Sequence, residues 1–475
     1  MKIDVLTGNN LDVLRGFADN CIDSVVTDPP YGLGSEPDAM AMLTDWITTG
    51  HHEVRGKGFM GKEWDAFVPQ PVFWREVYRV LKPGGHMLVF AGTRTMDLMT
   101  LGLRIAGFEI RDSIGWAHED SYGAPVMSWC YGSGFPKTLD VAKAIDKHCG
   151  VDGLREFSHK NPADRPYTYL EGQTSTGWQS PVRPDKTKPY SEDAKQFSGF
   201  GTALKPAWEP IIIARKPLDG TVAANVLKWG TGGINVDGCR IPTDPSVDDK
   251  RLGGNGTWST ESAAKNVYEG GYAGERVGSS PSGRFPANVI TDGSDAVVGW
   301  FPESSVTGVR KKEHLPSVIK NTPFSMGNPL AEYPNDKGSA SRFFYAAKAS
   351  PAERNAGCEN LPKRQGGMVS NTSGQHLTRR DEEYESPSVG NFHPTVKPIS
   401  LIRYLARLIT PPGGTCLDPF AGSGTTGIAC EQEGFNAILI EREQEYIPII
   451  NARVSHAQAN NVQPTTTPDS QLSLF

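Results

Sequence analysis

The segment VVTDPPYG at residues 25–32 sets a carboxylate, two prolines and an aromatic ring directly after an apolar run. Proline has no backbone N–H to donate to a neighbouring strand, so it ends the strand that precedes it. Asp28 and Tyr31 are therefore predicted at the carboxyl end of a buried strand. Ligands bind along that edge in open α/β sheets, so the segment predicts a binding or catalytic site.

A second candidate site lies in LDPFAGSGTTG at residues 417–427, where Gly422, Gly424 and Gly427 follow an apolar run with the spacing G-x-G-x-x-G. Such a turn between a strand and a helix lets the backbone approach a nucleotide closely. The acidic residue near the end of the next apolar run, Glu441, is placed to accept a hydrogen bond from a ribose hydroxyl. A nicotinamide dehydrogenase fits these residues as well as other nucleotide-binding proteins do.

The carboxylate of Asp418 distinguishes between the ligands that this turn would bind. A dinucleotide places its pyrophosphate at the start of the helix, and a carboxylate just before the turn would repel it. The same carboxylate suits a ligand that carries an ammonium and a sulfonium. S-adenosyl-L-methionine has both groups and a ribose for Glu441, so the methyl donor is the favoured ligand and a dehydrogenase is the alternative.

With DPPYG, HPTVKP and LDPFAGSGTT in this order, the chain resembles the β-class DNA amino-methyltransferases, the site-specific adenine-N6 or cytosine-N4 methylases of phages and bacteria. In that family the acceptor motif precedes the cofactor motif. The resemblance therefore implies an α/β fold with a circularly permuted, Rossmann-like methyltransferase sheet that binds S-adenosyl-L-methionine and carries large inserted recognition modules. It covers residues 1–116, 206–217 and 393–456.

The resemblance also implies a role for each motif residue. Asp28 and the main-chain carbonyl of Pro29 would accept hydrogen bonds from the exocyclic amine of a flipped base, next to Pro30, and Tyr31 would stack on that base. Lys397 would face the methionine carboxylate of the cofactor, and Asn9 stands where the family more often has aspartate. The implied cofactor-binding residues are Asp28, Thr395, Lys397, Asp418, Pro419, Phe420, Gly422, Ser423, Gly424, Thr425 and Glu441.

The acceptor in double-stranded DNA would be an amine. Methylation of cytosine at carbon 5 needs a cysteine nucleophile, which that family carries in a Pro-Cys dipeptide, and this sequence has no Pro-Cys. Aspartate as the first residue of the acceptor motif is the usual adenine form, so Asp28 favours adenine N6. Cytosine N4 is one alternative, and a degenerate scaffold that only binds DNA or a clamp is another.

The segment QLSLF at residues 471–475 matches the consensus peptide by which bacterial replication proteins bind the DNA polymerase sliding clamp. Its apolar side chains would enter a groove on the clamp, and the Thr- and Pro-rich segment before it would act as a tether. A frayed end is the alternative. The clamp-binding residues would be Gln471, Leu472, Ser473, Leu474 and Phe475.

Composition limits the remaining function classes. The net charge of −6 does not favour a nucleic-acid partner, because domains that bind nucleic acid are usually basic, so any such surface must be local. Seven cysteines without a CxxC pair or zinc spacing predict no metal site and fit a reducing compartment. With no signal peptide and no long apolar span, we expect a cytoplasmic protein without a membrane partner. A homodimer is a further expectation.

Alternating strands and helices must position these motifs. The pattern predicts helices over 71–81 and 94–107, a strand over 86–92, and a mostly parallel sheet. A helix is also predicted within 393–410. The predicted organisation is a catalytic domain in two parts, 1–116 with the acceptor motif and 393–456 with the cofactor motif, an insertion at 117–205, a sheet strand within 206–217, a target-recognition region at 218–392, and a flexible tail at 457–475.

Overall fold

The computed structural model describes the chain in ranges, which are 1–32, 34, 37–54, 65–112, 126–130, 139–150, 189, 191–202, 208–242, 283–299, 301, 303–305, 337–339, 344–346, 351–365 and 388–460. The clamp-binding segment and most of the predicted tail lie outside them. The chain forms two compact units. The first comprises Met1–Gly132, Trp208–Asn371 and His376–Phe475, and the second comprises Ser133–Ala207 and Thr372–Gln375.

A ten-stranded sheet forms the centre of the first unit, in the order β1-β14-β13-β2-β3-β6-β5-β7-β10, with β4 also paired to β6. Its strands are β1 (Ile3–Thr7), β2 (Ile22–Thr27), β3 (Leu81–Phe90), β4 (Glu109–Asp112), β5 (Val126–Cys130), β6 (Trp208–Arg215), β7 (Val289–Thr291), β10 (Tyr345–Ala346), β13 (Thr415–Asp418) and β14 (Asn436–Glu441). Two separate pairs are β8 (Glu303–Ser305) with β9 (Lys337–Ser339) and β11 (Arg364–Gln365) with β12 (Ser388–Val389).

The helices of the first unit are α1 (Asn10–Arg15), α2 (Ala39–Thr48), α3 (Pro71–Val80), α4 (Met96–Ala106), α7 (Val222–Trp229), the 3₁₀-helix η5 (Asp237–Cys239), α10 (Asp295–Val298), α11 (Pro351–Asn355), α12 (Ile399–Ile409), α13 (Thr425–Glu433) and α14 (Ile447–Asn460). The second unit contains α5 (Val141–His148) and α6 (Glu192–Gln196). The backbone N–H and the hydroxyl of Ser191 join these two helices by donating to buried Asp146. This pair falls within the segment predicted as an insertion.

The order of the strands is circularly permuted, as predicted. The late strands β13 and β14 lie between β1 and β2, and all four of these strands run parallel, together with β3. The carboxyl ends of β2, β13 and β14 therefore meet at one edge of the sheet. β6 runs antiparallel to β3, so its amino end lies at that same edge.

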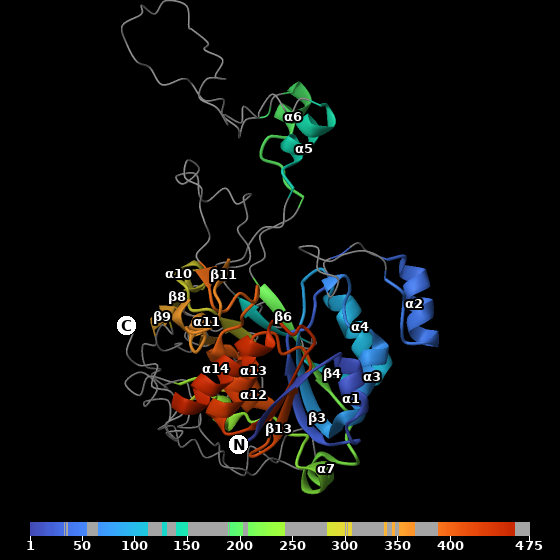
Figure 1. Ribbon diagram of the computed structural model, residues 1–475, viewed down its shortest axis with the longest axis vertical. Coiled ribbons are helices and arrows are strands. Elements are labelled where there is room, and N and C mark those ends of the chain that lie inside the picture. The colour runs from blue at the N-terminus through green and yellow to red at the C-terminus, as the bar shows by residue number, and fades with distance from the viewer. Residues whose placement is uncertain are drawn as a thin grey trace, which may run out of the picture. The chain divides into compact units, whose positions relative to one another are not determined.

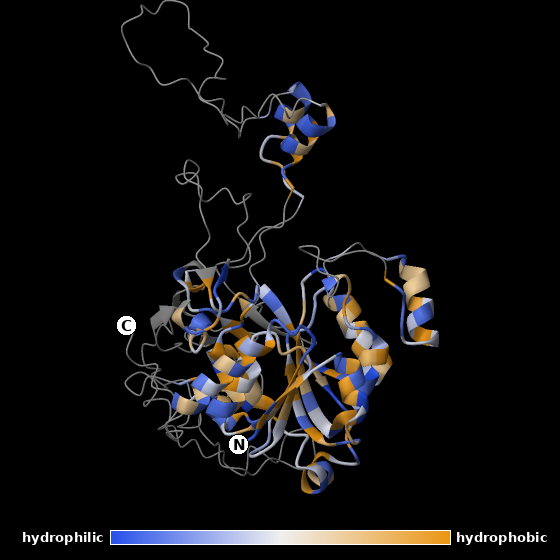
Figure 2. Ribbon diagram, in the orientation of Figure 1, coloured by the Kyte–Doolittle hydropathy of each residue, from blue (hydrophilic) through white to orange (hydrophobic). Residues whose placement is uncertain are grey.

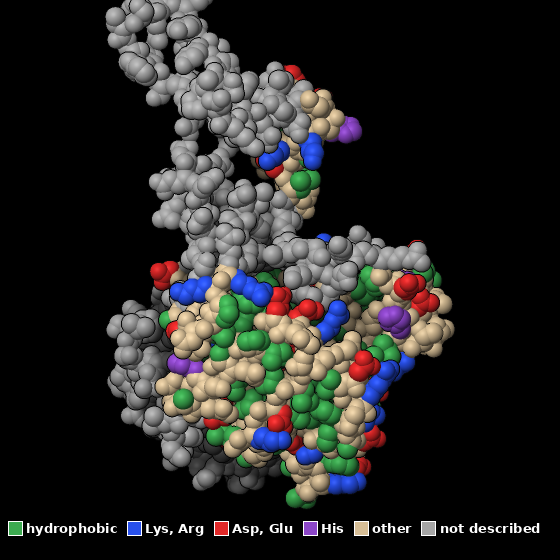
Figure 3. Space-filling view, viewed as in Figure 1, with side chains coloured by type: hydrophobic (Ala, Val, Ile, Leu, Met, Phe, Trp, Pro, Cys, Tyr) green, Lys and Arg blue, Asp and Glu red, His purple; other side chains and the backbone are tan. Residues whose placement is uncertain are grey.

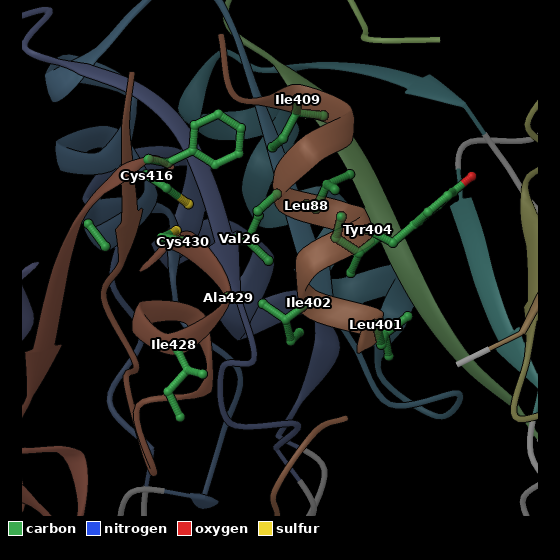
Figure 4. Close-up of a cluster of buried hydrophobic side chains, with 14 of the residues drawn as sticks. Val26, Leu88, Leu401, Ile402, Tyr404, Ile409, Cys416, Ile428, Ala429 and Cys430 are labelled. Carbon is green, nitrogen blue, oxygen red and sulfur yellow. The ribbon is translucent and has the colours of Figure 1, made fainter. Parts of the chain in front are cut away.

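Helices cover both faces of the sheet, which gives the fold two hydrophobic cores (Figure 1). Successive strand residues point to opposite faces. Val26 and Leu88 pack with α12 and α13 in the core of Figure 4, whereas Val25 and Met87 pack with α3 and α4. Because both faces are covered, the central strands contain many apolar residues, which are orange in Figure 2, although β2 and β3 also hold polar residues such as Asp23 and His86.

The predicted elements are present, with shifted boundaries. The strand expected over 86–92 begins at Leu81. The helix expected within 393–410 begins only at Ile399, because a residue that precedes a proline is disfavoured in the helical conformation and HPTVKP holds two prolines. The region 218–392 also contributes β7 and β10 to the main sheet.

The face of the molecule drawn in Figure 3 mixes basic and acidic side chains over its described residues. Within the part of the chain that the structure describes, every helix is too short or too polar to cross a membrane.

Leu405 on α12 tests the packing that holds this layer on the sheet. It is 0% exposed, so Leu405→Ala removes buried methyl groups and leaves a cavity, and we expect a loss of about 2–5 kcal/mol of unfolding free energy in urea denaturation. Leu227→Ala on α7 is the matched control. Its side chain is 89% exposed, so we expect a change within about 0.5 kcal/mol. Equal losses in the two variants would contradict the layer assignment.

Candidate active site

Three carboxylates lie along the edge where the parallel strands end. Asp28 follows β2, Asp418 is the last residue of β13, and Glu441 is the last residue of β14. β13 pairs with both neighbours, with Leu417 opposite Val25 of β2 and Asp418 opposite Leu439 of β14. The DPPY segment and the glycine turn, far apart in the sequence, are thereby brought side by side.

Asp28, Tyr31, Glu209 and Lys397 form one group, which we call the acceptor cluster. Lys397 Nζ lies 2.9 Å from Asp28 Oδ2 and 3.1 Å from Glu209 Oε2. The same ammonium donates to the Tyr31 hydroxyl at 3.1 Å. The Tyr31 hydroxyl lies 2.8 Å from Asp28 Oδ1 and 3.4 Å from Glu209 Oε2. Two carboxylates and a phenol thus share one ammonium.

The charges of the acceptor cluster are largely withdrawn from water. The side chains of Asp28, Glu209 and Lys397 are 23%, 19% and 10% exposed. Burial alone would lower the pKa of Lys397, but Asp28 and Glu209 outweigh burial and raise that pKa well above its ordinary value. Burial raises the pKa of Glu209, with help from the charge of Asp28 and against the charge of Lys397. Lys397 is therefore a permanent cation at neutral pH.

Strand direction brings Glu209 to this edge. In the antiparallel pair of β3 and β6, Phe90 lies opposite Ile211. The next backbone contact is the N–H of Ala91, which donates to Pro210 O at 3.0 Å. Glu209, one residue earlier in β6, therefore reaches the end of β3 rather than the far edge of the sheet.

Backbone contacts fix the position of Tyr31. Its N–H donates to Asp65 Oδ1 at 3.2 Å, and its carbonyl accepts from the Thr95 hydroxyl. A Cβ atom on Gly92 would lie 3.2 Å from Tyr31 Cβ, so the end of β3 comes very close. The Lys397 ammonium lies 5.4 Å from the centre of the Tyr31 ring. Tyr31 is thus held beside Asp28.

Asp418 is bound by its own surroundings. Its carboxylate accepts from the Thr27 hydroxyl at 2.8 Å, the Thr426 hydroxyl at 2.6 Å and the Phe420 N–H at 3.1 Å. Burial raises the pKa of Asp418 to about 6, against these three donors. The side chain therefore links β2, β13 and α13. A direct contact of Asp418 with a cofactor stays a prediction.

Glu441 supports the glycine turn. Its Oε2 atom accepts from the N–H of Gly422, and its Oε1 atom accepts from the N–H of Glu443, each at 2.8 Å. Gly422 and Gly424 have φ values of 54° and 77°, in the left-handed region that favours glycine. Each carboxylate oxygen of Glu441 keeps a second lone pair, so the residue can still accept from a bound ribose.

Phe420 and Pro419 of the turn contact helices α3 and α1. Phe420 packs edge-on against Phe73 of α3, with ring centres 5.2 Å apart. Pro419 O accepts from the side chain of Asn10 at 3.1 Å, and Asn9 accepts from the Leu11 N–H as the N-cap of α1. The unusual residue at position 9 therefore has a structural role.

Arg453 of α14 supports the turn from within the core. It is 1% exposed, and its Nη1 atom donates to Ser423 O at 2.7 Å, Ser423 Oγ at 3.0 Å and Thr425 Oγ1 at 3.1 Å. Burial lowers the pKa of Arg453 to about 10, so the guanidinium stays charged at neutral pH. Ser423 and Thr425 thus bind Arg453 as well as shaping the turn.

The HPTVKP segment lies between the acceptor cluster and the glycine turn. The ring of His393 lies so close to Gly422 that a Cβ atom there would be 3.0 Å from it. His393 Nδ1 lies 2.7 Å from Thr395 O, and burial lowers the pKa of His393 to about 4, so the ring is neutral at neutral pH. Thr395 is exposed, whereas Lys397 belongs to the acceptor cluster. A contact of Lys397 with a methionine carboxylate stays a prediction.

Helix α11, from the predicted recognition region, holds this segment in place. The Arg354 guanidinium donates to His393 O, and Glu353 accepts from the N–H of Ile399 at the start of α12. Asn391 completes the link, because its side chain donates to Arg354 O at 2.7 Å and accepts from the N–H of His393 at 3.1 Å. Residues outside the motifs thus fix the conformation of HPTVKP.

A family model described as DNA methylase, of the N6/N4 type, matches residues 22–139 and 178–452. The match covers well over half of the chain and includes all three motifs, so the chain belongs to this family of DNA methylases. The resemblance inferred from the motifs is therefore confirmed at the level of the family, and the dehydrogenase alternative is set aside.

Curated relatives match over short stretches. The Type II methyltransferase M2.DpnII of Streptococcus pneumoniae is 39% identical over 85 residues, which make up 18% of this chain and 30% of that protein. The Type II methyltransferase M.HinfI of Haemophilus influenzae is 41% identical over 68 residues, which make up 14% of this chain and 19% of that protein. The matched stretches thus span less than a third of either relative.

Solved structures that are similar include a complex of M1.HpyAVI with SAM, at 12% identity and a TM-score of 0.33, with 95% of this chain and 99% of that chain covered. The cytosine-N4-specific PvuII DNA methyltransferase is also 12% identical, with a TM-score of 0.39 and coverage of 95% and 86%.

The structure adds residues that the sequence analysis did not assign to the site. The sequence places Glu209 only in a sheet strand, and it does not show that this strand runs antiparallel. Arg453 looks like an ordinary helix residue, and Thr27 like a strand residue. The one available signal for Glu209 is a carboxylate at the head of the apolar run PIIIA.

The close approach of Gly422 to His393 can be tested against Gly413. Both glycines have positive φ, so alanine costs backbone energy at either position, but a Cβ atom on Gly413 meets nothing within 4 Å. Gly422→Ala should displace His393 and the turn, and we expect about tenfold weaker binding of S-adenosyl-L-methionine by calorimetry. Gly413→Ala should leave the affinity unchanged. Similar affinities in both variants would show that the contact does not shape the cofactor site.

Proposed function

We propose that this chain transfers a methyl group from S-adenosyl-L-methionine to the N6 amine of an adenine flipped out of double-stranded DNA, as a β-class enzyme. The observation that carries the proposal is the pairing of β2 with β13, which sets Asp28 beside the glycine turn. A donor bound at the turn and a base bound at Asp28 would then be neighbours.

The glycine turn and its surroundings fit the proposed cofactor. Gly422 and Gly424 place no side chain at two positions of the turn, and Glu441 would supply an acceptor for the ribose. Phe420 offers a ring next to the turn. When bound, S-adenosyl-L-methionine supplies an electrophilic methyl group on a sulfonium, and the chain's own residues position the amine that receives it.

Asp28 and the carbonyl of Pro29 would hold the amine. Two acceptors on the two N–H bonds leave the nitrogen lone pair directed at the methyl group, so positioning supplies much of the rate. As the N–C bond forms, the S–C bond breaks with its electron pair on sulfur, and the amine gives up one proton, which Asp28 accepts. Tyr31 would stack on the base, which must leave the duplex to reach the site.

Adenine is preferred over cytosine on the strength of the first motif residue, because aspartate at position 28 is the usual adenine form in the family that the chain resembles. The N4 amine of cytosine presents the same pair of N–H bonds. The identity of the methylated base in the reaction product therefore distinguishes adenine from cytosine as the acceptor.

The first experiment is methyl transfer to duplex DNA with labelled S-adenosyl-L-methionine, followed by digestion to nucleosides and mass spectrometry. We expect N6-methyladenine from the wild type and a loss of at least about 100-fold in Asp28→Ala, because the amine loses its charged acceptor. Asp12→Ala, whose side chain is 70% exposed on α1, is the control and should keep full activity.

The products discriminate between the alternatives. N4-methylcytosine would overturn the base assignment and keep the rest of the proposal. No methylated base, with S-adenosyl-L-methionine still bound, would instead support a degenerate scaffold that only binds DNA.

We further propose that residues 471–475 recruit the enzyme to the bacterial sliding clamp, and hence to newly replicated DNA in the cytoplasm. The support is the match of QLSLF to the clamp-binding consensus, behind a Thr- and Pro-rich tether. Whether the active form is a homodimer stays a prediction.

Deletion of residues 471–475 should abolish binding to purified clamp in surface plasmon resonance, while methylation of DNA in the absence of clamp stays at the wild-type rate. The double variant Leu474→Ala, Phe475→Ala should lose binding in the same way, because these side chains would fill the groove. Clamp binding that is retained in both variants would contradict the proposal.

A further inference from the structure

The acceptor cluster contains one carboxylate more than a simple ion pair would need. Asp28 and Glu209 both contact the single ammonium of Lys397. The proposed mechanism assigns a task to Asp28, and the family resemblance implies one for Lys397 at the methionine end of the cofactor. It leaves Glu209 without one, although burying a second carboxylate at this edge is costly.

The ammonium stands where the target amine would have to go. Lys397 Nζ lies 2.9 Å from Asp28 Oδ2, 4.9 Å from the centre of the Phe90 ring and 5.4 Å from that of Tyr31. A base stacked on Tyr31 with its amine on Asp28 would occupy this same space. The amine and the ammonium therefore compete for Asp28 Oδ2.

If Asp28 were its sole carboxylate partner, Lys397 would prevent the target amine from binding to Asp28. A charged donor binds a carboxylate more strongly than a neutral amine does. Asp28 would then be neutralised and blocked. A second carboxylate changes the balance, because the ammonium keeps a full ionic partner after it leaves Asp28.

We propose that Glu209 is a positioning residue for methyl transfer, which draws Lys397 away from Asp28 and leaves Asp28 charged and open to the target amine. This inference rests on the proposed function. Glu209 acts from β6, on the far side of the ammonium from β2, and does not itself contact the base. Its main effect on the reaction passes through Lys397, although its Oε2 atom also lies 3.4 Å from the Tyr31 hydroxyl.

The charge of Asp28 matters most at the moment of transfer. The methyl group carries positive charge from sulfur to the amine nitrogen, and an ionised carboxylate in contact with that nitrogen stabilises the charge as it develops. A carboxylate already paired with Lys397 gives little of this stabilisation. Loss of Glu209 should therefore lower kcat far more than it changes the KM for the cofactor.

Glu209→Gln tests this role, because the amide keeps the shape and a hydrogen-bond acceptor while it removes the charge. With the wild type active on DNA, we expect kcat at saturating S-adenosyl-L-methionine to fall about 10- to 100-fold. The cofactor KM should stay within about twofold. Glu109→Gln is the matched control, since Glu109 of β4 forms an ion pair of 2.6 Å with Arg215 of β6 outside the cluster. It should leave kcat unchanged.

A second substitution separates this role from simple structural damage. In the double variant Glu209→Gln, Lys397→Met, no cation remains to hold Asp28, so kcat at saturating cofactor should rise about tenfold over Glu209→Gln alone. A variant that merely disturbed the fold would lose further activity on a second change in the same cluster.

Base binding provides a readout without turnover. The affinity for a duplex with its target base is compared with that for a duplex lacking the base, by fluorescence anisotropy without cofactor. We expect the preference for the intact site to shrink several-fold in Glu209→Gln and to return in the double variant.

The results separate this inference from the proposed function. An active wild type with unchanged kcat in Glu209→Gln would overturn the role of Glu209 alone, as would a double variant slower than the single one. A wild type that methylates no DNA would overturn the proposed function and this inference with it.

Discussion

The site depends on the pairing of two short strands from opposite ends of the chain. β2 and β13 meet with Ser24 opposite Cys416 and Val25 opposite Leu417. A buried hydrogen bond joins the two strands, since Thr27 donates to Asp418 over 391 positions of sequence, and Ser24 of β2 also lies 2.8 Å from Thr410 at the end of α12. Because the strands are parallel, their carboxyl ends coincide, and so do the residues that follow them.

The contact between β2 and β13 includes a buried carboxylate, Asp418, whose charge is unfavourable. The pKa of Asp418 rises from 3.8 to about 6 on burial, which corresponds to about 3 kcal/mol of stability that is present in acid and is lost as the pH rises through about 6. At neutral pH the residue is therefore ionised at a cost. Three donors, from Thr27, Thr426 and the backbone of Phe420, limit that cost and in return fix β2, the turn and α13 together. A neutral residue would relieve the cost and would weaken this link between the strands.

The sequence was sufficient where chemistry is local. Prolines after an apolar run predicted the end of β2, and Gly107, with φ of 106°, ends α4 as its position predicted. It was insufficient where the outcome depends on a strand's direction or on a distant partner. The direction of β6 decides whether Glu209 reaches the site, and direction leaves no mark in an apolar run. The contacts between α11 and HPTVKP were likewise unpredictable, because no motif lies between these two segments of the chain. The later start of α12 within the predicted range 393–410 has a local cause, the two prolines of HPTVKP.

The carboxylates of the site bear on how an acidic chain would act on DNA. The carboxylates at the sheet edge suit a cationic methyl donor and, under the proposed function, would keep the phosphates of DNA away from the site. A flipped base is neutral and would bring its amine to Asp28 without its phosphate approaching the acceptor cluster. The proposed reaction would therefore need no basic pocket, and attraction to the DNA backbone would come from local surfaces elsewhere. A net charge of −6 would then be compatible with the proposed DNA substrate, because the flipped base itself carries no charge.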